Sequence, residues 1–157
     1  MKKLLFILLT LALIVPAYAA APASISGLDT AKFVVDLNQG EGKKLRLRLS
    51  LILETIENIE KYGVKADVVV AVRGVASEFM MDSRAMLDDR DAEIQKDVYA
   101  LINKLSEKGV RLEQCAVALR LLKISPSEII PKLTVVENGY VSLIGYQNKG
   151  YALLPME

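Results

Sequence analysis

The chain contains one cysteine, Cys115, and no histidine among its 157 residues. Without histidine, the sequence excludes Ser-His and Cys-His catalytic pairs and every metal site built on imidazole. A single cysteine also excludes an internal disulfide, a Cys-x-x-Cys redox pair and a thiolate metal cluster. Cys115 is therefore a buried apolar side chain, one half of an intermolecular disulfide, or a thiol kept for reaction. We expect no metal site and no bound cofactor.

The position of Cys115 is compatible with a reactive thiol. Val110–Gln114 is predicted to be a strand and Ala116–Leu122 a short helix, so Cys115 lies where one gives way to the other. A thiol there faces unpaired backbone N–H groups and the positive end of the helix dipole, and both favour the nucleophilic thiolate. Arg120 and Lys123 could add positive potential if the chain folds back. From position alone, an inert cysteine packed among apolar side chains is the more common case, because free cysteine is among the most buried residue types.

A second strand-to-helix junction, residues 38–44 (NQGEGKK), contains glycines and lysines. Glycines let backbone N–H groups turn towards an anion, and Lys43 or Lys44 could assist. The segment lacks the spacing of the dinucleotide fingerprint or the Walker loop, and Glu41 would repel a phosphate. We interpret it as an ordinary turn, with nucleotide or flavin binding at the Gly40 loop as an alternative function.

A third junction, Arg73–Met81, follows a buried strand. Because parallel strands end on one side of a sheet, we expect Arg73 to lie at the same edge as Cys115. Arg73 is therefore a candidate for binding an anion or stabilising the thiolate. We interpret Phe79 and the two methionines after it as core or subunit contacts rather than as the lining of a pocket.

Strands and helices alternate along the rest of the chain. Strands are predicted at residues 32–37, 66–72, 110–114, 133–136 and 151–154, and helices at 43–61, 91–109, 116–122 and 140–149. A short helical stretch is expected near Val75–Met81, and Asp91 is expected to cap the second long helix. The alternation predicts an α/β fold of three layers, with a mostly parallel five-stranded sheet and helices on both faces.

The N-terminus has the pattern of a secretory signal peptide. Lys2 and Lys3 precede Leu4–Val15, an apolar run of 12 residues. That run is short of the roughly 20 residues that a membrane-spanning helix needs. Ala17–Ala19 then has the small-x-small form that a signal peptidase requires, so cleavage is expected after Ala19. The alternative is an uncleaved membrane anchor.

Cleavage after Ala19 sets the domain organisation. Residues 1–19 are predicted to be a signal peptide, 20–31 a flexible lead-in and 32–157 a single domain. Loss of two lysines with the leader changes the formal net charge from +1 to −1. A nearly neutral chain with mixed charges has no electrostatic reason to bind nucleic acid or an anionic membrane. We expect a protein exported to the bacterial periplasm, without a stable membrane anchor after cleavage.

The segment around Cys115 resembles the sulfur-relay family of DsrE, DsrF and TusD proteins. In that family a Gly-Val-x-Leu-x-x-Cys-x-x-Ala-Leu-Arg-like stretch carries the sulfur-accepting cysteine, and here the stretch reads GVRLEQCAVALR. The tail is also similar, with LTVV followed by QNKGYALLP as the closing strand, helix and strand. The resemblance covers residues 32–155 and is most specific in the last third.

This resemblance implies a DsrE-like fold and a sulfur-handling function. Cys115 would take up sulfane sulfur as a persulfide and pass it to a partner thiol, as a sulfurtransferase or sulfur carrier does. Arg73 and Arg120 are the candidates for stabilising the thiolate or an anion. The implied partners are a protein thiol that donates or accepts sulfur, and further copies of the chain in a homo-oligomer. The alternative is a non-catalytic oligomeric binding or assembly module with Cys115 buried.

Overall fold

A computed structural model describes residues 22–83 and 87–157 of the protein. The predicted signal peptide and the first residues of the predicted lead-in lie outside the described residues. From Pro22 the chain forms turns, and the first strand begins at Thr30, two residues earlier than the sequence predicts. Within the two described ranges, no helix combines the length and apolar character that crossing a membrane requires.

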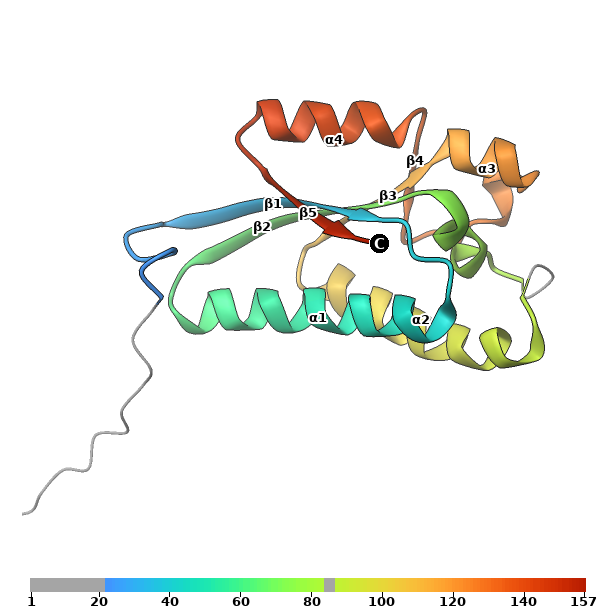
Figure 1. The fold of residues 1–157 in the computed structure, drawn as a ribbon, viewed down its shortest axis with the longest axis horizontal. Helices are drawn as coiled ribbons and strands as arrows, with labels where there is room; N and C mark the ends of the chain where they lie inside the picture. Colours follow the sequence, from blue (N-terminus) through green and yellow to red (C-terminus); the bar gives the residue numbers. More distant parts are fainter. Residues whose placement is uncertain (1–21, 84–86) are drawn as a thin grey trace, which may run out of the picture.

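Five parallel strands form one sheet in the order β4-β3-β2-β1-β5 (Figure 1). The strands are β1 (Thr30–Leu37), β2 (Lys65–Val72), β3 (Arg111–Cys115), β4 (Thr134–Val136) and β5 (Ala152–Met156). The central strands β1 and β2 end in five consecutive buried residues each. Such unbroken burial is typical of parallel strands covered on both faces, and the predicted fold class is confirmed.

Helices cover both faces of this sheet. In Figure 1, α1 (Gly42–Lys61) and α2 (Asp89–Glu107) lie along one face, and α4 (Gly139–Asn148) lies along the other. Three short elements, η1 (Gly74–Met80), α3 (Ala116–Leu122) and η2 (Pro126–Glu128), complete the chain. They follow the carboxyl ends of β2 and β3, where open parallel sheets hold their functional groups.

The start of α2 differs from the prediction. Asp88, rather than Asp91, is the capping residue, because the helix begins at Asp89. The Asp88 side chain accepts a hydrogen bond from the backbone N–H of Asp91 at 2.8 Å. The prediction was wrong because all three aspartates of this charge run can cap a helix, and the sequence does not distinguish them.

The larger apolar core lies between the sheet and the two long helices. The predicted helical spacing is confirmed, since Leu45, Leu49 and Ile52 of α1 and Val98 and Ile102 of α2 are fully buried. Burial of side chains at intervals of three and four residues fixes each helix against the strands. The residues Phe79–Met81 of η1 and its C-terminal end belong to the same core, rather than to a pocket.

Candidate functional site

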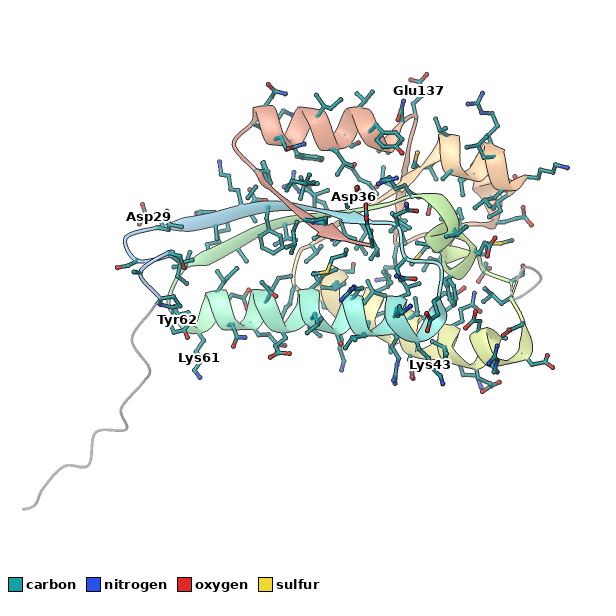
Figure 2. All side chains as sticks on the ribbon, viewed as in Figure 1. Asp29, Asp36, Lys43, Lys61, Tyr62 and Glu137 are labelled. Atoms are coloured by element: carbon teal, nitrogen blue, oxygen red, sulfur yellow. The ribbon has the colours of Figure 1, made fainter. Side chains whose placement is uncertain are left out.

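The carboxyl ends of three strands bring the candidate residues to one edge of the sheet. Asp36 is the penultimate residue of β1, Arg73 follows β2 directly, and Cys115 is the last residue of β3. Figure 2 shows Asp36 projecting from β1 on the side of the sheet covered by α4. Since the strands are parallel, residues far apart in sequence meet here.

A cavity of about 90 Å³ lies beside Cys115. Its lining residues are Arg73, Gly74, Cys115, Val117, Ala118, Leu121 and Tyr140. Cys115 is only 2% exposed, whereas Leu121 and Tyr140 are exposed. A reagent that modifies Cys115 in the folded protein must therefore enter through this cavity, between α3 and the start of α4.

The sulfur of Cys115 accepts a hydrogen bond from the backbone. The N–H of Gly139, the first residue of α4, donates to Sγ at 3.1 Å. A Cβ atom at Gly139 would lie 3.0 Å from Cβ and 3.3 Å from Sγ of Cys115, so a larger residue would push the helix away. A backbone donor at a helix N-terminus stabilises negative charge on the sulfur.

The helix that faces the sulfur is not the one expected from the sequence. Cys115 does precede α3, but its side chain makes no capping hydrogen bond there. The donor comes from α4, 24 residues further along the chain. Sequence reasoning missed Gly139, although Asn138-Gly139 before an apolar helix is a recognisable start signal, and Asn138 does cap α4 by accepting from Tyr140 N–H at 3.0 Å.

Arg73 is held by two neighbours. Its Nη2 donates to Oδ2 of Asp36 at 2.6 Å, and its Nε donates to the other carboxylate oxygen. Its Nη1 donates to the Tyr140 hydroxyl at 3.0 Å, and its Cζ lies 4.7 Å from the centre of the Tyr140 ring. The hydrogen bonds that Arg73 donates to Asp36 raise the pKa of Arg73 above its usual value. The guanidinium is thus charged, but a carboxylate balances that charge.

The predicted site residues are only partly brought together. Arg73 and Cys115 line the same cavity. Arg120 belongs to the last turn of α3, is exposed and does not line the cavity. Lys123 ends α3 in the left-handed conformation with φ of 58° and is also exposed. Asp36 and Tyr140 complete the site, and sequence reasoning did not include them.

The Gly40 loop is filled by protein side chains. The space next to Gly40, where a side chain would project, holds Val75, and that next to Gly42 holds the carboxylate of Asp91. A carboxylate at this position repels an incoming phosphate. This packing supports the interpretation of the loop as an ordinary turn.

The strand end that carries Cys115 is fastened to η1 by a buried amide. Gln114 Nε2 donates to Ser77 Oγ at 2.8 Å and to the carbonyl of Cys115 at 3.3 Å. Both polar side chains are fully buried, and Gln114 Oε1 has no partner among the described residues. The amide fixes the backbone that presents the thiol to the cavity.

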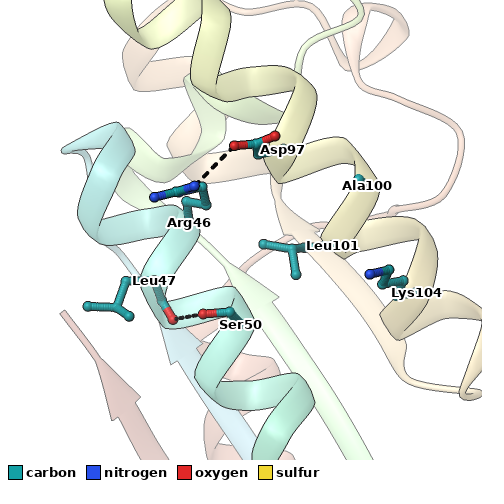
Figure 3. A pocket seen from close by; sticks show the side chains of 7 residues that line it. All are labelled: Arg46, Leu47, Ser50, Asp97, Ala100, Leu101 and Lys104. Carbon is teal, nitrogen blue, oxygen red and sulfur yellow. Dashed lines mark hydrogen bonds and ion pairs between the residues drawn. The ribbon is translucent and has the colours of Figure 1, made fainter.

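A larger cavity of about 460 Å³ lies between α1 and α2 (Figure 3). Its lining includes Arg46 and Asp97, which pair at 3.2 Å across the two helices. Both side chains are more than half exposed, and such surface ion pairs contribute little to stability. The cavity lies on the far side of the sheet from α4, and the residues lining it include no thiol, so it has no part in the candidate chemistry.

Comparison with known proteins identifies the family. The sequence model of the DsrE/DsrF-like family matches residues 24–156. This chain belongs to the DsrE/DsrF-like family. The resemblance inferred from the segment around Cys115 is therefore confirmed, and the match extends over nearly all the described residues.

The proteins similar to this DsrE/DsrF-like chain include a bacterial and an archaeal one. An uncharacterised protein of Aquifex aeolicus (strain VF5) is 26% identical over 125 residues, which cover 79% of this chain and 55% of that protein. The chain thus spans about half the length of this relative. The solved structure of MTH1491 from Methanobacterium thermoautotrophicum, a protein of unknown function, has a TM-score of 0.61 and 18% identity, with 80% of this chain and 98% of that one covered. That likeness supports the fold.

Proposed function

We propose that this DsrE/DsrF-like protein carries sulfane sulfur as a persulfide on Cys115 and passes it to the thiol of a partner protein. Family membership is compatible with a sulfur-relay role. The observation that carries the proposal is the placement of Cys115, at the wall of a small cavity with the Gly139 N–H directed at its sulfur. Both features suit a thiol that must react as an anion in a restricted space.

The proposed cycle has two thiol–sulfane exchanges. In the first, the Cys115 thiolate attacks a sulfane sulfur of a donor, and the donor's remaining sulfur leaves as a thiolate or hydrosulfide. In the second, a partner thiolate attacks the outer sulfur of the persulfide, and Cys115 leaves as a thiolate. The Gly139 N–H stabilises the charge on Sγ before the first step and after the second.

Intact-mass analysis tests the proposal directly. After exposure to a persulfide donor, the wild-type protein should gain one sulfur atom, and a partner thiol should then remove it. Because the chain has one cysteine, Cys115→Ser should gain nothing, so any gain in this variant measures non-specific sulfur. A wild-type protein that gains no sulfur, under conditions where an established carrier does, would rule the proposal out.

An assembly module is the second candidate function, because α4 exposes apolar side chains. Val141 is 65% exposed and Ile144 is 60% exposed. Gly145 lies on the same outward side, and no atom is within 4 Å of where its Cβ would be. Glycine inside a helix is unfavourable unless something approaches its backbone closely, and a helix that is apolar all round is normally buried.

The occupant that fits this face is a second copy of the chain. Antiparallel pairing of two α4 helices about a two-fold axis would place Val141 of each against Gly145 of the other. It would also bring the helix end that carries Glu137 level with the end that carries Lys149, so opposite charges meet. Light scattering should show that Val141→Glu reduces self-association. The matched control is Leu47→Glu, at an exposed leucine of α1.

The two candidate functions separate by thiol labelling. A reactive carrier should be labelled at Cys115 in the native state by a small thiol reagent. A purely structural cysteine should be labelled only after unfolding. If the protein self-associates and Cys115 is labelled in the native state, the protein has both functions. If it self-associates and Cys115 is labelled only after unfolding, only the assembly function remains.

Export is part of the same proposal. We infer that residues 1–19 direct the protein to the bacterial periplasm and are then removed. The mature protein recovered from that compartment should begin at Ala20 and have the corresponding mass. A full-length chain in the membrane fraction would instead mean that the leader acts as an uncleaved anchor.

A further inference from the structure

We infer that the Cys115 cavity selects sulfur donors by charge, taking neutral or singly charged sulfanes such as disulfane and disfavouring doubly charged donors such as thiosulfate. This inference rests on the proposed sulfur-carrying function and specifies its donor class. It follows from the bonding of Arg73, which is the one cationic residue among the described residues that line the cavity.

The positive charge of Arg73 is already engaged. Two of its nitrogens donate to the Asp36 carboxylate, and the third donates to the Tyr140 hydroxyl. The Arg73 and Asp36 side chains are 12% and 11% exposed, so water screens the pair only weakly. An anion that enters the cavity therefore meets an ion pair whose charges balance, rather than a free cation, so a second negative charge on the ligand gains little attraction.

The rest of the cavity is apolar and small. Val117, Ala118 and Leu121 contribute carbon atoms to the lining. The volume is about 90 Å³, compared with about 460 Å³ for the cavity between α1 and α2. A doubly charged donor would have to lose part of its hydration here without gaining a free cation, which is costly. A sulfane without a sulfonate group carries less charge and loses less hydration.

The favoured reaction balances without a further reactant. The Cys115 thiolate attacks one sulfur of disulfane, HS–SH, and a new Sγ–S bond forms. The S–S bond of disulfane breaks, and the departing sulfur takes the electron pair and leaves as HS⁻. The transferred sulfur keeps its proton, so the product is Cys115–S–SH. With thiosulfate, the leaving group would be sulfite, whose two negative charges would remain in a cavity where the Arg73 cation is already paired with Asp36.

The closing experiment measures rates of sulfur gain by intact mass. Wild-type protein reacts with sodium disulfide at neutral pH and, separately, with sodium thiosulfate, and each rate is divided by the rate for free cysteine. The ratio of the rate with inorganic disulfide to the rate with thiosulfate should be higher for the wild-type protein than for free cysteine. Asp36→Asn leaves the Arg73 charge unbalanced, so the thiosulfate rate should rise about tenfold relative to the disulfide rate.

The matched control is Asp97→Asn. Asp97 also pairs with an arginine and its replacement changes the net charge equally, but it lies on the outer side of α1 and α2 (Figure 3). This control should leave the ratio of the two rates unchanged. A wild-type ratio equal to that of free cysteine would overturn the inference, as would a ratio that Asp36→Asn does not alter. Equal loading from both donors would overturn charge selection while leaving the sulfur-carrying function intact.

A second measurement keeps the inference testable without sulfur loading or the variant. Neutral methyl methanethiosulfonate and the anionic sulfonatoethyl methanethiosulfonate both modify thiols. Relative to free cysteine, the neutral reagent should modify wild-type Cys115 about tenfold faster than the anionic one. The cationic trimethylammonioethyl reagent, which is similar in size to the anionic one, controls for size. Equal relative rates for the anionic and cationic reagents would contradict charge selection even if no donor loads sulfur.

Discussion

The two faces of the sheet differ in how they are covered, although the same strands form both. The face towards α1 and α2 carries a large apolar core that includes Leu45, Leu49 and Ile102. On the face towards α4, the buried apolar cluster among the residues that the structure describes is small and consists of Val34, Val69, Ala71 and Leu143. Two long amphipathic helices cover the first face, whereas one ten-residue helix covers the second.

Polar groups take the place of apolar contacts on the α4 face. Arg111 contacts Asp67 at 2.6 Å and the Tyr151 hydroxyl at 2.8 Å, and Tyr151 donates to Asp67 at 2.7 Å. Tyr146 of α4 donates to Glu113 at 2.7 Å. The thiol of Cys115 lies at the end of this face. One face therefore supplies most of the stability, while the other accepts polar groups and holds the candidate chemistry.

The largest expected effect comes from truncating one leucine on each face. Leu49→Ala should cost about 4 kcal/mol of the free energy of unfolding, near the top of the usual range, because its neighbours on α1, α2 and the sheet are fixed. Leu143→Ala should cost about 2 kcal/mol, since the cluster around it is small and close to solvent. Urea denaturation of both variants measures the difference. An equal or larger loss for Leu143→Ala would mean that the α4 face contributes as much stability as the other.

The second prediction concerns two glycines of α4. Gly139→Ala should destabilise the protein by about 2 kcal/mol, because the new Cβ would lie 3.0 Å from Cβ of Cys115. Gly145→Ala is the matched control in the same helix and should stabilise the chain by about 0.5–1 kcal/mol, since its side chain would project into open space. Thermal denaturation at low protein concentration compares them. A neutral Gly139→Ala would show that α4 is not closely packed on Cys115.

The third prediction compares arginines on the two faces. Arg111→Met removes the ion pair with Asp67 and the contacts with two tyrosine rings, at 5.2 and 5.4 Å from its Cζ. Because Arg111 is partly exposed, we expect a loss of about 1 kcal/mol that decreases at high salt. Arg46→Met, on the outer side of α1, should stay within about 0.5 kcal/mol. Urea denaturation at two salt concentrations measures both variants, and equal losses would remove the distinction.

The architecture was predictable because hydrophobic patterns fix the elements locally. The run Ala66–Val72 is apolar at nearly every position, which predicts a strand covered on both faces, and β2 is such a strand. The spacing of Leu45, Leu49 and Ile52 likewise predicts the buried stripe of α1. Each of these signals lies within one element and needs no knowledge of its neighbours.

The site was less predictable because its geometry depends on contacts between distant segments. Cys115 and Arg73 were found from their residue types at strand ends. The hydrogen bond from Gly139 depends on where α4 docks, 24 residues after the cysteine. The pairing of Arg73 with Asp36 depends on the parallel alignment of β1 and β2, and in the sequence Asp36 is only a polar residue near the end of a largely apolar strand. Whether the thiol reacts stays a prediction.

The smallest effect is expected at Glu78, whose side-chain carboxyl belongs to η1 and lies next to residues of the larger apolar core. Partial burial raises its pKa above the usual value of 4.5, and the nearby charge of Asp91 raises it further. The folded state therefore holds this proton more tightly than the unfolded state, so stability is lost as pH rises above the ordinary carboxyl range. Glu78→Gln should stabilise the protein at pH 7 by less than about 1 kcal/mol, with no gain below about pH 4. Thermal denaturation across this pH range measures the gain, with Glu54→Gln on the exposed side of α1 as the control. If Glu78→Gln stabilised the protein equally at both ends of the pH range, the titration of Glu78 would not be the source of the gain. The surroundings of Glu78 would then tolerate its charge.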